Sequence, residues 1–582
     1  MSFTGSQRMS AVGIHILSWM VGAVCVAAEP DSTLNPMRSF IEHHTADFGS
    51  LDRLDSTPGS GARHTRLQKF FQDESTRLSQ VDFASLDPSG RIDYLLMAGK
   101  LRFEQSELER RQKQWLEAAP LLPFSSKIVE LVSARQQGNT PDPESCAKTL
   151  TDIDGQITKL RADLDEKLKS GRSTAGLPTV VLANRTAQYL DQLRASLREW
   201  NGFYQGYDPT FSWWMHEAYP RVEKSLKEYG EFLQKNLVGA ADGTDSPVIG
   251  DPIGREGLAE SLAVEMIAAT PEELIAMAEK EWAWCQVEMK RAANDLGCGD
   301  DWKAALAKVT AMHVAPGEQP KLIRDLAVEA TAFVEDHGLV TVPALCKETW
   351  RLEMMSPERQ KVNPYFTGGE VISISFPTEE MAYSDKIMSL KGNNRAFCRA
   401  TVFHELIPGH HLQGFMADRY NAHRQAFRTP FLIEGWALYW EMRLWDEHFP
   451  RTAEERVGML FWRSFRCQRV ICSLKFHLGQ MTAGEWIDVL VDRVGHERRN
   501  ATAEVRRSVN GAYSPLYQAA YLIGGLQLRA LHHDLVDGKK MSEREFNDAI
   551  LRENSIPIEM IRASLTKADL SKDWKPKSKS QD

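Results

Sequence analysis

The segment RATVFHELIPGHHLQGF, residues 399–415, concentrates side chains that bind metals and transfer protons. In many zinc hydrolases, two histidines at positions i and i+4 of one helix bind the metal, and the glutamate after the first histidine acts on the bound water. His404 and Glu405 reproduce the first half of this pattern, but Pro408 stands where the second histidine should be. Proline offers no ligand atom and cannot donate to the helix hydrogen-bond ladder. A second histidine ligand must therefore come from elsewhere.

Two histidines follow this proline. In a straight helix, His411 lies seven residues and roughly 10 Å of rise beyond His404, which is too far for both to bind one ion. His410 lies six residues on and roughly 240° around the helix, so it also requires a deformed backbone. Pro408 removes a ladder hydrogen bond, and Gly409 accepts unusual dihedral angles. A bulged turn at these two residues could bring His410 onto the face of His404.

A carboxylate for the third ligand position is present in TPFLIEGWALYWEMRLW, which predicts an amphipathic helix. Glu434 lies near its start, 24 residues beyond His410, and this separation allows a turn and a returning antiparallel helix. His404, His410 and Glu434 would form a catalytic zinc site with three protein ligands and an open position for water. Glu441, on the same helix face, either orients a ligand or is a solvated surface carboxylate.

The elements that position these residues are predicted to be mostly helices. LTDIDGQITKLRADLDEKLKS and YPRVEKSLKEYGEFLQKNL place apolar residues three and four apart between charged ones. Turn clusters interrupt the helical period, but no long low-complexity linker separates independent domains. The sequence therefore predicts a mainly α fold and one large catalytic domain over residues 29–582, in which residues 30 to about 250 form a helical half that covers the rest.

One segment departs from the helical period. GGEVISISFPT, from Gly368 to Thr378, alternates Val and Ser with Ile and Phe between glycines and a proline, which predicts a strand. Two interpretations are open. The strand belongs to a buried hairpin, or it is an edge strand beside the active site that pairs with an extended substrate.

Composition narrows the class of protein. The 582 residues are 42% hydrophobic and 26% charged, with a net charge of −9, as in a folded soluble enzyme. Acidic and basic residues are interspersed, which argues against a nucleic-acid partner. Beyond the N-terminal segment, no stretch approaches 18 consecutive apolar residues, so no stable membrane insertion is expected for the mature protein. Seven cysteines follow the N-terminal segment without a CxxC pair, which predicts small buried side chains and, at most, one incidental disulfide.

The N-terminal segment has the plan of a secretory signal peptide. Arg8 precedes an apolar run from Ala11 to Val26, and two small residues end at Ala28. We expect cleavage after Ala28 and export to the periplasm or the extracellular space. An uncleaved membrane anchor and lipid attachment through Cys25 are the alternatives.

The segments HELIPGHHLQ and FLIEGWALYWE resemble the two characteristic segments of the domain of unknown function 885 family, which is grouped with zincin-like metallopeptidases. This resemblance implies a mainly helical fold with a deep central cleft, similar to gluzincin carboxypeptidases and dipeptidases, and zinc-dependent hydrolysis of short peptides. By position, His404 and Glu434 match metal ligands, and Glu405 matches the general base. His410 matches the displaced second histidine, and His411 is a substitute ligand or a transition-state donor.

The resemblance is weaker towards the C-terminus. Family members carry a proline-glycine and then a tyrosine-lysine-isoleucine-glycine run, whereas this chain reads AYSPLYQAAYLIGG. Tyr521 occupies the matching place, where its hydroxyl would stabilise the oxyanion of a tetrahedral intermediate. Its alternative is a core aromatic residue. Arg506 or Arg507 would hold a substrate carboxylate, or form a surface salt bridge.

These observations predict an exported zinc metallopeptidase for short peptides. The alternatives are a zinc amidase or esterase for another bond, and an inactive homologue that binds peptides. Exo- or endo-action, the oligomeric state, the physiological substrate and the metal used in the cell are left open.

Overall fold

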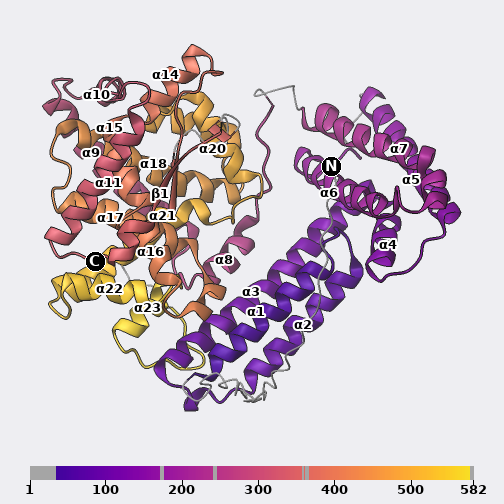
Figure 1. Ribbon diagram of the computed structural model, residues 1–582, viewed down its shortest axis with the longest axis horizontal. Coiled ribbons are helices and arrows are strands. Elements are labelled where there is room, and N and C mark those ends of the chain that lie inside the picture. Colours follow the sequence, from indigo (N-terminus) through magenta and orange to yellow (C-terminus); the bar gives the residue numbers. More distant parts are fainter. Residues whose placement is uncertain (1–34, 171–175, 240–245, 357–358, 361–365, 577–582) are drawn as a thin grey trace, which may run out of the picture.

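Helices make up nearly all of the regular structure in the computed structural model, which describes residues 35–170, 176–239, 246–356, 359–360 and 366–576 (Figure 1). The mainly α fold predicted from the sequence is confirmed. The predicted signal peptide, residues 1–28, lies outside the described residues. Within the ranges given above, no helix is both long and apolar enough to cross a membrane.

The N-terminal part consists of two groups of helices with different packing. Helices α1 to α3 share a hydrophobic core with the C-terminal part of the chain, whereas α4 to α7 pack around a core of their own. Figure 1 shows this second group at the far end of the molecule from α17 and α21. The bounds are α1 (Pro36–Leu54), α2 (Gly61–Ser79), α3 (Pro88–Ala118), α4 (Ser125–Gln136), α5 (Pro143–Ser170), α6 (Val180–Tyr204) and α7 (Pro209–Phe232).

The C-terminal part surrounds two buried helices, α17 and α18. Its helices are α8 (Gly254–Val264), α9 (Pro271–Asp295), α10 (Trp302–Thr310), α11 (Gln319–Asp336), α12 (Ala344–Thr349), α14 (Tyr383–Gly392), α15 (Arg395–Glu405), α16 (His410–Ala417), α17 (Pro430–Asp446), α18 (Ala453–His477), α19 (Ala483–Val489), α20 (Arg498–Val509), α21 (Tyr517–His532), α22 (Glu543–Arg552) and α23 (Ile558–Leu565).

Local sequence explains where the two helices that carry the candidate ligands begin. Asn394 precedes α15 and accepts a hydrogen bond from the backbone N–H of Phe397. Thr429 precedes α17 and accepts a hydrogen bond from the backbone N–H of Phe431, and Pro430 occupies the first helical position. The sequence predicted an amphipathic α17, but the helix is buried on all faces because α15, α16 and α21 pack around it. Its position in the core holds the carboxylates of α17 in a fixed place.

The small sheet has three strands in the order β1-β3-β2, namely β1 (Arg351–Met354), β2 (Phe366–Thr367) and β3 (Val371–Ile374). β3 pairs with β1 in parallel and with β2 in antiparallel orientation. The predicted strand is therefore present as β3. Of the two interpretations, the edge strand is wrong, because β3 has a neighbour on each side, and the antiparallel pairing with β2 agrees with the hairpin.

Helices α17 and α21 approach so closely that their contact requires glycine. A Cβ atom added at Gly524 would lie 1.9 Å from the carbonyl oxygen of Phe431. In contrast, a Cβ at Gly525 would make only ordinary contacts, at 3.4 Å from Leu438. Because α17 and α21 both contribute to the site described below, this contact also sets the site's geometry.

We therefore expect Gly524→Ala to destabilise the protein by about 2 kcal/mol or more, since the added methyl group must push two packed helices apart. Gly525→Ala is the matched control and should be neutral or slightly stabilising, because alanine favours helix more than glycine. Thermal or denaturant unfolding of both variants compares the two effects. Equal stability of the two variants would contradict this account of the contact.

All seven cysteines in the described part of the chain are free thiols, and all except Cys298 are buried. They pack as small apolar side chains, as the sequence predicted.

Candidate metal centre

The Pro-Gly pair breaks one helix into two. Helix α15 ends at Glu405, and α16 begins at His410. Between them the backbone N–H of Gly409 donates to the carbonyl of Phe403, at 3.0 Å. A Cβ atom on Gly409 would lie 1.9 Å from the carbonyl oxygen of His404, so no larger residue fits there. The sequence predicted a bulge within one helix. The structure instead has a tight turn between two helices, because the chain folds back on the end of α15.

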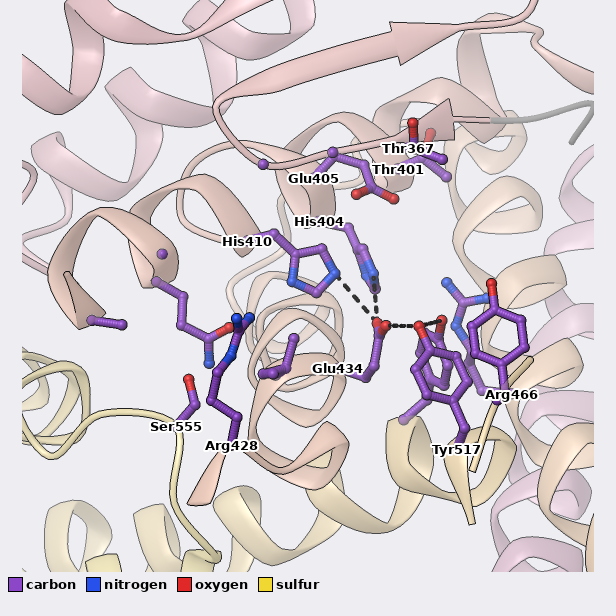
Figure 2. A pocket seen from close by; sticks show the side chains of 18 of the residues that line it. Thr367, Thr401, His404, Glu405, His410, Arg428, Glu434, Arg466, Tyr517 and Ser555 are labelled. Carbon is purple, nitrogen blue, oxygen red and sulfur yellow. Dashed lines mark hydrogen bonds and ion pairs between the residues drawn. The ribbon is translucent and has the colours of Figure 1, made fainter. Parts of the chain in front are cut away.

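This turn brings His410 to His404. Their rings are 4.8 Å apart between centroids and perpendicular to each other. Glu434 reaches the same point from α17, and its Oε2 lies 3.7 Å from Nε2 of His404 and 3.3 Å from Nε2 of His410 (Figure 2). One ligand atom from each of the three residues lies within 4.8 Å of the others. The predicted set of His404, His410 and Glu434 is therefore assembled.

The three side chains fit a metal ion. Ligand atoms about 2.0 to 2.1 Å from a tetrahedral zinc lie roughly 3.3 Å apart, close to the spacing observed here. Oε2 of Glu434 is buried and accepts no hydrogen bond from any described residue. Such an unsatisfied buried carboxylate oxygen is costly unless a cation completes it. The set can hold a metal, and two imidazoles with one carboxylate are ligands that zinc accepts.

The charge state of the carboxylate also suits a cation. Burial by itself would raise the pKa of Glu434, but the positive charge of His410 and the nearby ring of His404 outweigh it and hold the pKa well below the usual range. Glu434 is therefore ionised at neutral pH. An ionised carboxylate is the form that binds a metal.

Glu441 orients His404. Its Oε1 accepts a hydrogen bond of 2.7 Å from Nδ1–H of His404, and the carboxylate is buried. The alternative of a solvated surface carboxylate is therefore wrong, and Glu441 is a buried partner of His404. With a metal bound, Nδ1 would keep its proton and Nε2 would be free for the metal, as in carboxylate–histidine–metal arrangements. Burial would lower the pKa of His404, but the carboxylates of Glu434 and Glu441 beside the ring raise it to about 9.

Two tyrosines from α21 complete the far wall of the site. The hydroxyl of Tyr517 donates to Oε1 of Glu434, and the hydroxyl of Tyr521 lies 3.4 Å from that of Tyr517. Burial, above all, keeps the pKa of both hydroxyls well above their ordinary value, so both stay protonated. Sequence reasoning selected Tyr521 and missed Tyr517. The spacing of four residues on one helix face was the signal that could have revealed it.

The site lies in a cavity of about 460 Å³. Glu405 lines this cavity and projects from the end of α15 above the two histidines (Figure 2). The turn between β2 and β3 passes beside it, where the backbone N–H of Gly369 donates to the carbonyl of Glu405 at 3.3 Å. The small sheet is therefore next to the site, as expected, and Thr367 at the end of β2 lines the cavity.

His411 is not brought to the site. Its buried ring donates from Nε2 to the backbone carbonyl of Cys346, at 2.8 Å, and it does not line the cavity. The expectation of a ligand or transition-state donor at His411 has no support, because successive residues of a helix point about 100° apart and His411 therefore faces Cys346 instead of the cavity.

The two predicted arginines also differ in position. Arg507 lines the cavity and forms an ion pair with Glu504, at 2.5 Å, whereas Arg506 donates to the backbone carbonyl of Ser246 and does not line the cavity. Arg507 thus forms a salt bridge, but on the cavity wall and not at the outer surface.

The expected covering half does not contribute to the cavity wall. All of the lining residues that the structure describes lie between Thr367 and Ser555. The helices α4 to α7 are remote from it, because they pack around their own core.

The start of α17 rests on an unusual carboxyl group. Thr429 donates a hydrogen bond to Glu265, and burial raises the pKa of Glu265 to about 7, although the hydrogen bond with Thr429 partly opposes this shift. The folded protein therefore binds a proton at Glu265 more tightly than the unfolded chain does. The stability that this proton contributes is fully present below about pH 4.5 and is lost as the pH rises through about 7.

We therefore expect Glu265→Gln to match the wild type in stability near pH 4.5 and to exceed it by about 3 kcal/mol at pH 8. Glutamine keeps the acceptor for Thr429 and cannot ionise. Unfolding of both proteins across this pH range measures the effect, and a stability difference that does not change with pH would contradict it.

Comparison with known proteins assigns the chain to a protein family. A family model described as "Bacterial protein of unknown function (DUF885)" matches residues 46–565. The comparison with curated proteins found no match.

Two solved structures share the fold. One, described as "a putative lipoprotein of unknown function from Shewanella oneidensis", has a TM-score of 0.68 at 16% identity, covering 91% of this chain and 99% of that chain. The other, described as "the putative lipoprotein from Colwellia psychrerythraea", has a TM-score of 0.57 at 15% identity, covering 91% and 98% of the two chains. At these identities the likeness establishes the fold alone.

Proposed function

The chain belongs to the bacterial DUF885 family, and we propose that it is a zinc-dependent peptidase that hydrolyses short peptides. The observation that carries this proposal is the buried set of His404, His410 and Glu434, in which one carboxylate oxygen accepts no hydrogen bond from the described residues. Glu405 beside this set supplies the base that metal-assisted hydrolysis needs. The zincin-like character of the fold is part of the proposal.

Each side chain has a separate task in this reaction. A bound zinc ion would lower the pKa of a water molecule and polarise the scissile carbonyl. Glu405 accepts the proton of the attacking water and passes it to the leaving amine, while Glu441 holds the ring of His404 in place.

The two tyrosines of α21 have different roles, one at Glu434 and one at the oxygen of the reacting carbonyl. Tyr517 keeps one oxygen of Glu434 occupied, so that the other faces the histidines. Tyr521, which stays protonated, donates to the negative charge that develops on the carbonyl oxygen.

The place of action proposed here is outside the cytoplasm. The N-terminal segment has the plan of a signal peptide, and both similar structures carry descriptions as lipoproteins. An exported peptidase would act on short peptides in the periplasm or the extracellular space.

The experiment that tests the proposal combines metal analysis with a substrate screen. The purified mature protein is dialysed against trace zinc, analysed for metal, and incubated with a mixed library of short peptides. We expect about one zinc per chain and cleavage that a chelator stops and zinc restores. Bound zinc without cleavage of any peptide would overturn the peptidase assignment. The absence of bound metal would overturn the zinc site as well.

A further inference from the structure

Arg466 is a buried cation without a full partner. Only 5% of this residue is exposed, although it lines the cavity. Its Nε makes no hydrogen bond to any described residue. The carboxylate oxygen beside it, Oε1 of Glu441, lies 3.7 Å from Nη2, beyond hydrogen-bond distance, and already accepts from His404. A guanidinium in such a place is costly unless an anion completes it.

The neighbouring arginines lie closer to a carboxylate. Arg469 and Arg507 share Glu504, at 2.6 and 2.5 Å, although Nε of Arg469 also makes no hydrogen bond to a described residue. Arg466 has no carboxylate oxygen of a described residue within hydrogen-bond distance. Its Cζ lies 4.7 Å from the ring centroid of Tyr521 and 5.3 Å from that of Trp462, and these rings provide no negative charge. Of these three arginines, Arg466 is therefore the one that most lacks an anionic partner.

The guanidinium lies near the candidate metal centre. Nη2 of Arg466 is 3.7 Å from Glu441, and Glu441 is 2.7 Å from Nδ1 of His404. The ring of Tyr521 packs against the guanidinium of Arg466 and also stacks on the ring of His404, with ring centroids 6.3 Å apart. An extended residue spans about 3.5 Å. These contacts place the guanidinium within about the length of two extended residues of the metal ligands.

We propose that Arg466 binds the C-terminal carboxylate of the substrate, so that the enzyme removes one or two residues from the C-terminus of a peptide. This inference rests on the proposed peptidase function. In the reaction the amide C–N bond breaks, the hydroxyl of water joins the acyl carbon, and the proton goes to the leaving amine. The C-terminal carboxylate is unchanged and anchors the leaving product. A guanidinium suits this task because its planar fork binds a carboxylate through two hydrogen bonds.

The test compares substrates that differ only at this group. A library of N-acetylated short peptides with free C-termini is incubated with the zinc-loaded wild type beside the same library with C-terminal amides. We expect kcat/KM for the free acids to exceed that for the amides by about 100-fold, because the amide leaves Arg466 unpaired. Equal cleavage of both libraries, or faster cleavage of the amides, would overturn the proposal without any variant.

Two variants locate the anchor. Arg466→Gln should abolish the preference by reducing cleavage of free acids and leaving that of amides nearly unchanged. Arg428→Gln is the control, because Arg428 is an exposed arginine on the opposite side of Glu434 (Figure 2), and it should retain the preference. Zinc content and Tm are measured for both. Loss of the preference in Arg428→Gln and its retention in Arg466→Gln would overturn the assignment to Arg466.

A binding measurement separates this proposal from the peptidase assignment. Glu405→Gln is titrated calorimetrically with trialanine and with trialanine amide, alone and combined with Arg466→Gln. We expect the free acid to bind about 100-fold more tightly, and the difference to disappear in the double variant. This result would support the carboxylate site even if the wild type cleaved no peptide. Equal binding of the two probes would overturn it.

Discussion

Glu405→Gln is expected to bind zinc like the wild type and to lose peptide hydrolysis by about 1,000-fold in kcat. Glutamine has the size of glutamate, and Glu405 contributes no atom to the set of three candidate ligands. The amide cannot accept the proton of the attacking water, so the chemical step fails while the metal site stays intact. Steady-state kinetics on a peptide selected in the library screen, together with zinc content, measures both effects.

Thr401→Val is a suitable control for Glu405→Gln. Thr401 lines the same cavity one turn earlier on α15, and its hydroxyl donates to the carbonyl of Phe397 within the helix. We expect this variant to change kcat by less than about tenfold, since it removes no proton acceptor. Full activity of Glu405→Gln would exclude Glu405 as the base. Loss of zinc from that variant would instead show that Glu405 supports the metal site.

Removal of a ligand should have the largest effect on metal content. His404→Ala and Glu434→Ala are expected to lose bound zinc after dialysis against trace metal, because two protein ligands cannot retain it against exchange. Glu441→Gln should retain zinc with about 10- to 100-fold weaker affinity, since it only orients the ring of His404. Metal analysis and competition with a chromophoric chelator measure these differences.

The adjacent histidine provides the matched control for the ligand variants. His411→Gln removes an imidazole next to His410 and should retain zinc, because its ring donates to the carbonyl of Cys346, away from the cavity. Zinc loss in His411→Gln with retention in a His410→Ala variant would reverse the assignment of the second ligand. Zinc binding by Glu434→Ala at wild-type affinity would remove Glu434 from the site.

The sequence by itself determined the local elements and the types of residue available for chemistry. The His-Glu pattern at His404 indicated a helix, present as α15, and the amphipathic pattern of TPFLIEGWALYWEMRLW predicted α17. The alternation after Gly368 predicted β3. These features follow from the chain's own periodicity and from side chains that cap or break nearby hydrogen bonds, so they are readable without a fold. The metal-binding residue types on those elements were visible for the same reason.

Only the tertiary structure decided which of these residues meet. The choice of His410 over His411 depends on the direction of the first turn of α16, which the packing of Gly409 against the end of α15 sets. Tyr517 reaches Glu434, 83 residues away in sequence, because α17 and α21 pack closely. Arg466 lies on α18, which is buried nearly all round, so its sequence gives no sign that it faces the cavity. Side-chain direction and long-range packing are properties of the whole fold, and a local pattern does not contain them.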